Sequence, residues 1–155
     1  MELSDILVED AVLFCPGVKS KQQLLEIAAE TAGRLFRQNS ELVLEALSNR
    51  EALGSTGLGD GIAIPHGKMA GLHRVVGVFV RLEPAIDFEA VDDQPVDLVL
   101  ALLAPIGAGA EHLKALSRVA RALRNEGLVA ELRRTEDPAR LHAILTASET
   151  AHKAA

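Results

Sequence analysis

Among the histidines, His66 has the sequence surroundings that best suit a catalytic or ligand-binding role. It follows a short apolar run at residues 62–64 and stands between Pro65 and Gly67. Pro65 restricts the backbone before the imidazole, and Gly67 removes side-chain bulk after it. We expect a strand to deliver His66 to a loop at its end, where α/β sheets bind ligands and a macromolecule could reach the ring. The alternative is an ordinary loop histidine.

His112 is predicted to lie in the first turn of a helix over 111–125. Ala115 and Leu116 follow at helical spacing, so the imidazole should face the core. A helix N-terminus disfavours a protonated histidine and favours anions. A neutral His112 could therefore donate a hydrogen bond to a phosphoryl group on a neighbour, or it could be a core histidine with its hydrogen bonds satisfied.

Arg50 continues the apolar stripe of a predicted helix over about 41–53 and precedes a segment, 54–61, with four glycines in eight residues. An arginine on such a stripe is costly unless it is paired. Because the guanidinium matches phosphate geometry, Arg50 suits an anion site. The alternative is a buried ion pair with Glu51 or Asp60.

Other chemistries lack their motifs. Gly61 and Gly67 are one residue too far apart for a nucleotide-binding P-loop, and Met69 follows Lys68. His66 and His112 could contribute to a metal site, but the chain has no HExxH and no CxxC. A G-x-S-x-G nucleophile elbow is also missing. We predict no metal and no cofactor, and we expect the other three histidines at the surface.

Composition narrows the class of partner. The 155 residues carry a formal net charge of −6, with neither Trp nor Tyr. These features count against nucleic-acid binding, whereas an acidic surface suits a basic protein partner. No apolar run approaches the roughly 20 residues that span a bilayer, and the N-terminus does not resemble a signal peptide. The single cysteine, Cys15, fits a reducing compartment, so we expect a cytoplasmic protein.

Helices and strands should alternate to position these residues. Ser20 and Gln23 form a capping box that begins a helix over 20–38, and Ser40 should cap the next helix. Gly127 should end the helix over 111–125, a shorter helix should cover about 128–134, and Asp137 with Pro138 should begin the last one. Strands are predicted at 12–14, 62–64, 75–82 and 97–103. We predict one α/β domain over 1–146, with a mixed sheet of about five strands sandwiched between helices, and a polar tail over 147–155.

The stretch from Arg50 to Lys68, REALGSTGLGDGIAIPHGK, resembles the enzyme IIA components of the bacterial phosphoenolpyruvate-dependent phosphotransferase system, fructose/mannitol class. This family's pattern is an Arg-Glu pair, a Gly-rich loop and AIPH with its phosphorylated histidine. LSDIL near the start, SKQQLLEIAAETA, and PIGAGAEHLKALSRVARAL extend the resemblance over nearly the whole chain. The nitrogen-regulatory branch fits best.

The resemblance implies a reaction and the residues that perform it. His66 would attack the phosphohistidine of an HPr-like phosphocarrier of the NPr type, without metal or nucleotide. His112 would hydrogen-bond the phosphoryl group, and Arg50 would offset its charge. Backbone N–H groups of the glycine-rich segment would assist; the residues assigned to this phosphate loop are Ser55, Thr56, Gly57 and Gly67.

The resemblance also implies what the phosphoryl group is for. In the regulatory branch the phosphorylation state is the output and is read by target proteins, which we favour because the opening of the chain matches that branch. A sugar-specific IIA that passes the group to a IIB partner is the alternative. A binding module that never carries phosphate is a third reading, which the presence of both His66 and Arg50 disfavours.

Overall fold

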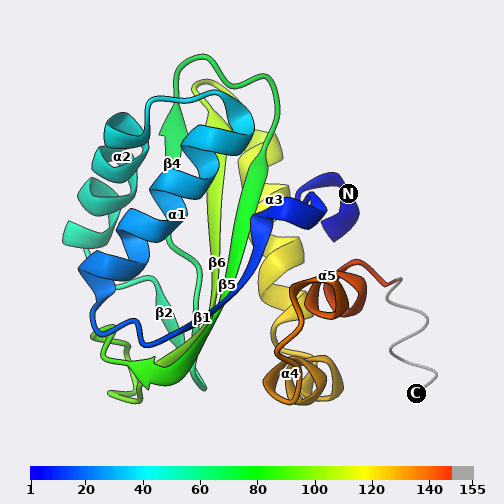
Figure 1. Ribbon diagram of the computed structural model, residues 1–155. Coiled ribbons are helices and arrows are strands. Elements are labelled where there is room, and N and C mark those ends of the chain that lie inside the picture. Colours follow the sequence, from blue (N-terminus) through cyan, green and yellow to red (C-terminus); the bar gives the residue numbers. More distant parts are fainter. Residues whose placement is uncertain (148–155) are drawn as a thin grey trace.

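The computed structural model describes residues 1–147, in which one mixed sheet separates two layers of helices (Figure 1). Along the sheet the order is β1-β5-β6-β3-β2, and β4 pairs with β6 beyond the end of β3. Strand β5 is antiparallel to β6, whereas β3 and β4 are both parallel to β6. The strands are β1 (Val12–Pro16), β2 (Gly57–Gly59), β3 (Ile62–Ala63), β4 (His66–Met69), β5 (Val76–Ile86) and β6 (Val96–Pro105).

The predicted mixed sheet between helices is confirmed, although it has six strands where about five were expected. The difference lies around Pro65, which has no N–H to donate. The chain pairs with β6 on both sides of this proline, as β3 and as β4. The glycine-rich segment, predicted as a loop, contributes β2, which pairs antiparallel with β3.

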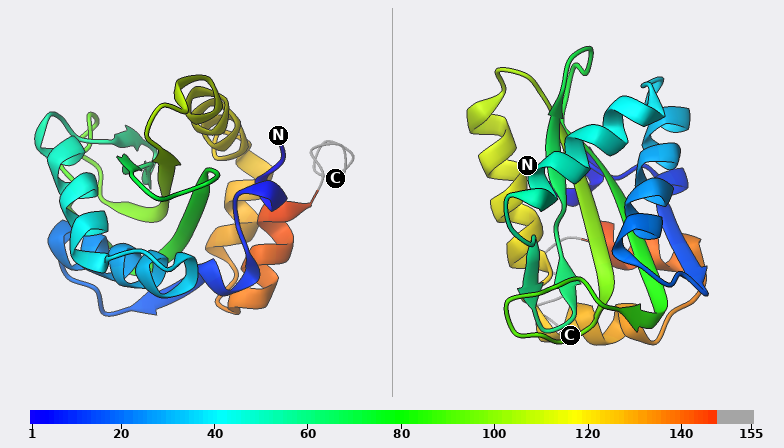
Figure 2. Two further views of the ribbon diagram at one scale, coloured as in Figure 1. Left: turned by 90° about the horizontal axis from the view of Figure 1, so that it is seen from above. Right: turned by 90° about the vertical axis from the view of Figure 1, so that its left-hand side faces the viewer.

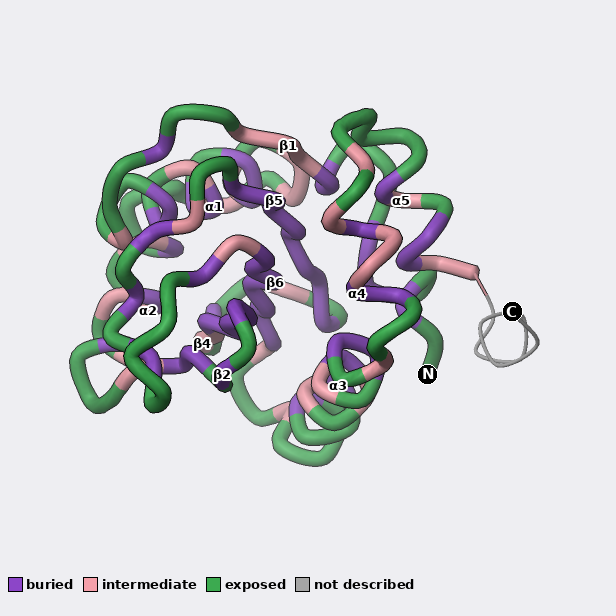
Figure 3. The backbone as a smooth tube through the Cα atoms, turned by 90° about the horizontal axis from the view of Figure 1, so that it is seen from below, coloured by how far each residue is buried: buried purple, intermediate pink, exposed green. Residues whose placement is uncertain are grey.

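The helices bury the two faces of the sheet in two separate apolar cores. Helices α1 (Lys21–Phe36) and α2 (Ser40–Ala52) cover one face, and α3 (Gly109–Ala122), α4 (Glu126–Arg133) and α5 (Pro138–Thr146) cover the other. The view from above in Figure 2 shows the sheet between these layers. Figure 3 shows how deeply β5 and β6 are buried between them, as the nearly unbroken apolar run of β6 predicts.

Two helix starts agree with the sequence. Ser20 caps α1 by accepting a hydrogen bond from the Gln23 backbone N–H, at 3.1 Å. The second hydrogen bond of the expected capping box differs: the Gln23 side chain accepts from the backbone N–H of Lys19 rather than from that of Ser20. At α5, Asp137 is the N-cap and Pro138 the first helical residue.

Two predicted boundaries are wrong. Asn39, not Ser40, caps α2, because the Asn39 side-chain oxygen accepts hydrogen bonds from the backbone N–H groups of Glu41 and Leu42. Gly127 does not end α3, which stops at Ala122. Asn125 begins a new helix there by accepting from the Leu128 N–H, so Gly127 lies in the first turn of α4. The expected polar tail and His152 lie outside the described residues, apart from Ala147.

Gly67 lets α2 approach β4 closely. A Cβ atom there would lie 3.1 Å from the Ala46 Cβ and 3.2 Å from the Ala46 carbonyl oxygen. Since the backbone of α2 cannot easily retreat, the missing side chain sets the spacing between this helix and the strand that begins with His66.

We expect Gly67→Val to lower the free energy of unfolding by about 1–3 kcal/mol, the usual cost of overpacking a core. Urea unfolding measures the change. Gly109→Ala is the control, because nothing lies within 4 Å of the position its Cβ would take. Unchanged stability of the valine variant would show that α2 is not held against β4 as described.

Candidate active site

His66 and His112 face each other across two elements. Their ring centroids are 5.4 Å apart and the rings are inclined by 52°. His66 is the first residue of β4, so the expectation that it lies in a loop is wrong. Its strand position makes it better held than a loop histidine, while the side chain is only partly buried. His112 lies in the first turn of α3, as predicted.

Strand β6 brings the two histidines together. His66 pairs in register with Leu102 near the end of β6. Three residues after Leu102 the strand ends at Pro105, and a short loop leads into α3, which carries His112. Both imidazoles are thus anchored to the same few residues of one buried strand.

The backbone orients the His66 ring. Its Nδ1 lies 2.9 Å from the carbonyl oxygen of Ile64. Because a carbonyl can only accept a hydrogen bond, this contact assigns the proton of the neutral ring to Nδ1. Nε2 then carries the free lone pair and is the nitrogen able to act as a nucleophile.

His112 is buried, with only 7% of its surface exposed, and its Nδ1 has no hydrogen-bond partner among residues 1–147. Burial lowers the pKa of His112 below its usual value of 6.5, and the charges of His66 and Lys68 lower it further. The ring is therefore neutral at pH 7. The reading of His112 as a satisfied core histidine is wrong, because one of its nitrogens is buried without a partner.

Lys68 is a further charged residue of this site and was not among the predicted functional residues. It is exposed on β4, two residues after His66, and its charge acts on His112. The signal was available in the strand period, since residues two apart on a strand project to the same face. An exposed cation beside two imidazoles makes this face favourable for a phosphoryl group.

The glycine-rich segment is held by its own side chains and by neighbours. The Thr56 N–H donates to both carboxylate oxygens of Glu51, at 3.1 and 3.2 Å, and the Gly57 N–H donates to the Ser55 hydroxyl oxygen at 3.1 Å. The Ser55 hydroxyl in turn donates to the carbonyl of Phe88. These backbone N–H groups, expected to point at a phosphoryl group, thus already have partners within the protein.

Arg50 is half-buried at the end of α2, and its Nη1 donates to the Gly54 carbonyl at 2.9 Å. The alternative of a buried ion pair is wrong: Glu51 pairs with Lys21, and Asp60 forms its hydrogen bonds through its backbone, to Arg133 and to Asp92. Within residues 1–147 no hydrogen bond joins Arg50 to either histidine, and its Nε and Nη2 have no partner. Arg50 comes from the helical layer opposite α3.

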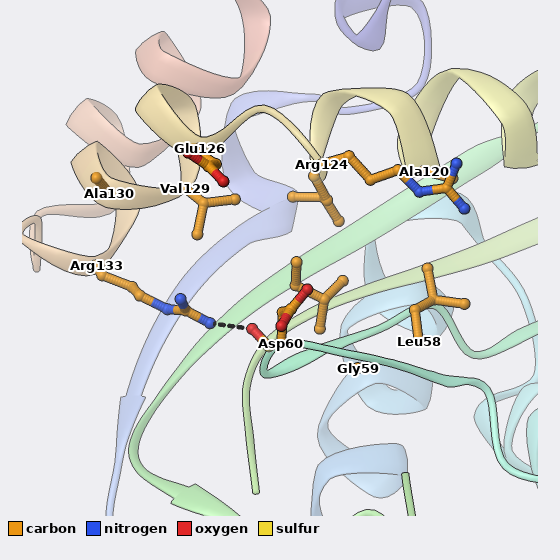
Figure 4. Close-up of a pocket in the computed structure, with 11 residues that line it drawn as sticks. Leu58, Gly59, Asp60, Ala120, Arg124, Glu126, Val129, Ala130 and Arg133 are labelled. Carbon is orange, nitrogen blue, oxygen red and sulfur yellow. Dashed lines mark hydrogen bonds between the residues drawn. The ribbon is translucent and has the colours of Figure 1, made fainter. Parts of the chain in front are cut away.

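A pocket of about 560 Å³ lies between the β2–β3 segment, the end of α3 and the length of α4 (Figure 4). Neither His66 nor His112 lines it. Arg133 crosses one side of this pocket, where its Nη2 donates to the Asp60 carbonyl at 2.6 Å. The guanidinium also forms a bidentate pair with Asp97. These contacts tie α4 to the β2–β3 turn.

The remaining features concern metals, membranes and the other histidines. Over the described part of the chain, His, Cys, Asp and Glu side chains do not gather in threes around a possible metal position. No helix within residues 1–147 has the length and apolarity to cross a bilayer. His73 is exposed as expected, and His142 is partly covered, with its Nε2 3.1 Å from the Leu7 carbonyl oxygen.

Comparison with known proteins agrees over nearly the full length. The sequence profile of the phosphoenolpyruvate-dependent sugar phosphotransferase system, EIIA 2, matches residues 5–148. The chain is 47% identical to a nitrogen regulatory protein of Bradyrhizobium diazoefficiens over 145 residues, covering 94% of this chain and 95% of the relative. It is 41% identical to a nitrogen regulatory protein of Escherichia coli K12 over 150 residues, covering 96% and 92%.

The fold agrees with a solved relative. The crystal structure of the nitrogen regulatory protein IIA-Ntr from Neisseria meningitidis superposes with a TM-score of 0.85 at 36% identity, covering 93% of this chain and 99% of that one. The arrangement of a mixed sheet between two helical layers is thus shared with a nitrogen-regulatory relative. From its sequence profile and its relatives, the chain belongs to the type-2 EIIA family of the phosphoenolpyruvate-dependent sugar phosphotransferase system.

Proposed function

We propose that this protein accepts a phosphoryl group on His66 Nε2 from the phosphohistidine of an HPr-like phosphocarrier of the NPr type, and that its phosphorylation state is a regulatory signal. The observation that carries the proposal is the hydrogen bond between His66 Nδ1 and the Ile64 carbonyl, 2.9 Å long, beside a second imidazole. Membership of the EIIA family supports phosphoryl transfer, and the nitrogen-regulatory relatives support the regulatory output.

The proposed transfer uses this geometry as follows. The Nε2 lone pair attacks phosphorus as the donor's N–P bond breaks, and the bonding electrons leave with the donor imidazole. His66 keeps its proton on Nδ1, so its ring becomes positively charged as the new N–P bond forms. The Ile64 carbonyl, which already accepts that proton's hydrogen bond, stabilises this charge.

His112 is proposed to donate a hydrogen bond to the phosphoryl oxygens. A buried N–H without a partner is rarer in proteins than an under-satisfied acceptor. The unpartnered buried Nδ1 of His112 is therefore assigned as the bare nitrogen, which leaves the proton on Nε2. Burial keeps His112 neutral. His112 can therefore donate a hydrogen bond from Nε2 without repelling the positive charge that forms on the His66 ring.

The other residues of the candidate site are proposed to take supporting roles. Lys68 and the free nitrogens of Arg50 are proposed to attract and neutralise the incoming phosphoryl group. We assign Ser55, Thr56, Gly57 and Gly67 to the shape of the site rather than to phosphate contacts. Thr56 and Gly57 donate their N–H groups within the protein, and the missing side chain of Gly67 admits α2.

The first test is phosphorylation by phosphoenolpyruvate through purified enzyme I and a phosphocarrier, read by intact mass. The wild type should gain one acid-labile phosphate of about 80 Da, the size of one added phosphoryl group, and His66→Ala should gain none. His73→Ala is the matched control, because His73 is exposed and is not part of the pair of facing rings. A labelled adduct that persists in His66→Ala would refute the assignment, and no gain with nitrogen-type or sugar-type carriers would refute phosphoryl transfer.

Removing the hydrogen bond from His112 should slow transfer. His112→Ala is expected to reduce the rate of phosphorylation by about 10²–10³-fold, the usual effect of losing one donor to developing charge. Rapid-mixing kinetics at saturating phosphocarrier measure this rate. A wild-type rate in a folded variant would assign His112 to the core alone.

The lowered pKa of His112 also predicts a pH-dependent stability. Between its folded pKa and the ordinary value of 6.5, the unfolded chain binds a proton that the folded protein does not. This group therefore lowers stability as the pH falls below about 6.5, with the loss growing down to the folded pKa.

Urea unfolding at pH 7.5 and at pH 5.0 measures this effect. His112→Gln should lose less stability over that interval than the wild type, because glutamine does not titrate. An equal loss in both proteins would show that the folded protein binds the proton at His112 as readily as the unfolded chain does.

A further inference from the structure

The carboxylate of Glu51 is buried beneath the glycine-rich segment and is fully engaged. Only 7% of the residue is exposed. It accepts hydrogen bonds from the Thr56 N–H and hydroxyl, and the Lys21 ammonium lies 2.9 Å from its Oε2. Lys21 itself is the first residue of α1 and lies over the ring of Phe88, 4.7 Å from its centroid.

This cluster connects to His66 through the backbone. The carbonyl of Thr56 accepts a hydrogen bond from the Ile64 N–H at 3.1 Å. The carbonyl of Ile64 accepts from His66 Nδ1 at 2.9 Å. A continuous series of polar contacts thus runs from Lys21 through Glu51, Thr56 and Ile64 to the imidazole.

We propose that Glu51 is a positioning residue for His66: by holding Thr56, it fixes the Ile64 carbonyl that selects the Nδ1–H tautomer and aims Nε2. This inference rests on the proposed phosphoryl transfer for its kinetic consequence, but the tautomer is a property of the free protein. Glu51 does not touch the reacting atoms and acts only through Thr56 and Ile64.

The glycine content and the backbone conformation of residues 54–61 explain why this segment needs a fixed contact such as Glu51. Residues 54–61 contain four glycines, three of which, Gly54, Gly59 and Gly61, adopt positive φ angles. Glycine backbone loses more conformational freedom on folding than any other residue, so the segment needs fixed contacts to stay in one conformation. A charged acceptor makes stronger hydrogen bonds than a neutral one. The Glu51 carboxylate is such an acceptor for both the N–H and the hydroxyl of Thr56.

Glutamine cannot replace this carboxylate. Three donors converge on Glu51: the Thr56 N–H, the Thr56 hydroxyl and the Lys21 ammonium. An amide offers one acceptor oxygen, and its NH₂ group would face at least one of these donors. Glu51→Gln therefore keeps the size of the side chain while releasing Thr56 or Lys21.

The test compares Glu51→Gln with Glu45→Gln, an exposed position on the same helix. The ¹⁵N and ¹H resonances of the His66 ring report which nitrogen carries the proton in the unphosphorylated protein. We expect Nδ1–H in the wild type and in Glu45→Gln, and a mixture of the two tautomers in Glu51→Gln. In the phosphotransfer assay Glu51→Gln should lose up to about 100-fold in kcat, as expected for a misplacement of about 1 Å, with an unchanged KM for the phosphocarrier.

Thr56 provides a second pair of variants should Glu51→Gln fail to fold. Thr56→Val removes the hydroxyl donor, and Thr56→Ser restores it. The valine variant should show the tautomer mixture and the reduced kcat, and the serine variant should restore both. Thermal unfolding of each variant separates these effects from a loss of folded protein.

The outcomes distinguish this inference from the proposed function. A folded Glu51→Gln or Thr56→Val variant with only Nδ1–H on His66 and wild-type kcat would overturn the positioning role. If the wild type takes no phosphoryl group from any carrier, the proposed function fails, while the resonances of His66 still decide whether Glu51 controls its tautomer.

Discussion

The site depends on the pairing of β4 with β6. Both β3 and β4 lie parallel to this one strand, on either side of Pro65, and β6 is buried along almost its whole length. Because His66 is in register with Leu102 and β6 continues into α3, the distance between His66 and His112 is set by backbone hydrogen bonds and a short loop. Apolar burial on both faces of the sheet keeps this strand in place, so the spacing of the two histidines depends on the packing of the core.

Polar contacts, rather than apolar packing, hold the glycine-rich segment in place. The cores position β6, α2 and α3, but the glycine-rich segment contributes few apolar side chains and cannot be held by burial alone. Groups from three other parts of the chain hold it instead: the Glu51 carboxylate accepts from Thr56, the Phe88 carbonyl accepts from Ser55, and the Arg133 guanidinium donates to the Asp60 carbonyl. The Asp92 carboxylate adds a further contact by accepting from the Asp60 N–H, and this hydrogen bond is the main cause of its lowered pKa.

A phosphoryl group on His66 would change this region chiefly through charge. It would place up to two negative charges beside Lys68 and the neutral His112, on a protein that already carries a net charge of −6. A partner that reads the phosphorylation state can therefore do so by electrostatics and hydrogen bonding at one exposed edge of the sheet. No rearrangement of the two apolar cores is required for such a signal.

The sequence by itself determined the local elements and the family. The cap residues Ser20 and Asp137, the apolar run of β6, and the stretch from Arg50 to Lys68 each carried enough local information to predict a helix start, a buried strand and the family. These signals work because capping, strand periodicity and motif spacing depend on residues a few positions apart.

Only the tertiary structure decided the partners. Arg50 and Glu51 are neighbours in sequence, yet Arg50 bonds the Gly54 carbonyl while Glu51 reaches Lys21, thirty residues away. The number of strands around Pro65 and the missing partner of the buried His112 Nδ1 also follow from the packing of segments that are distant in sequence. Such contacts depend on which buried groups find a donor or an acceptor once the layers have packed, and no local pattern records that outcome.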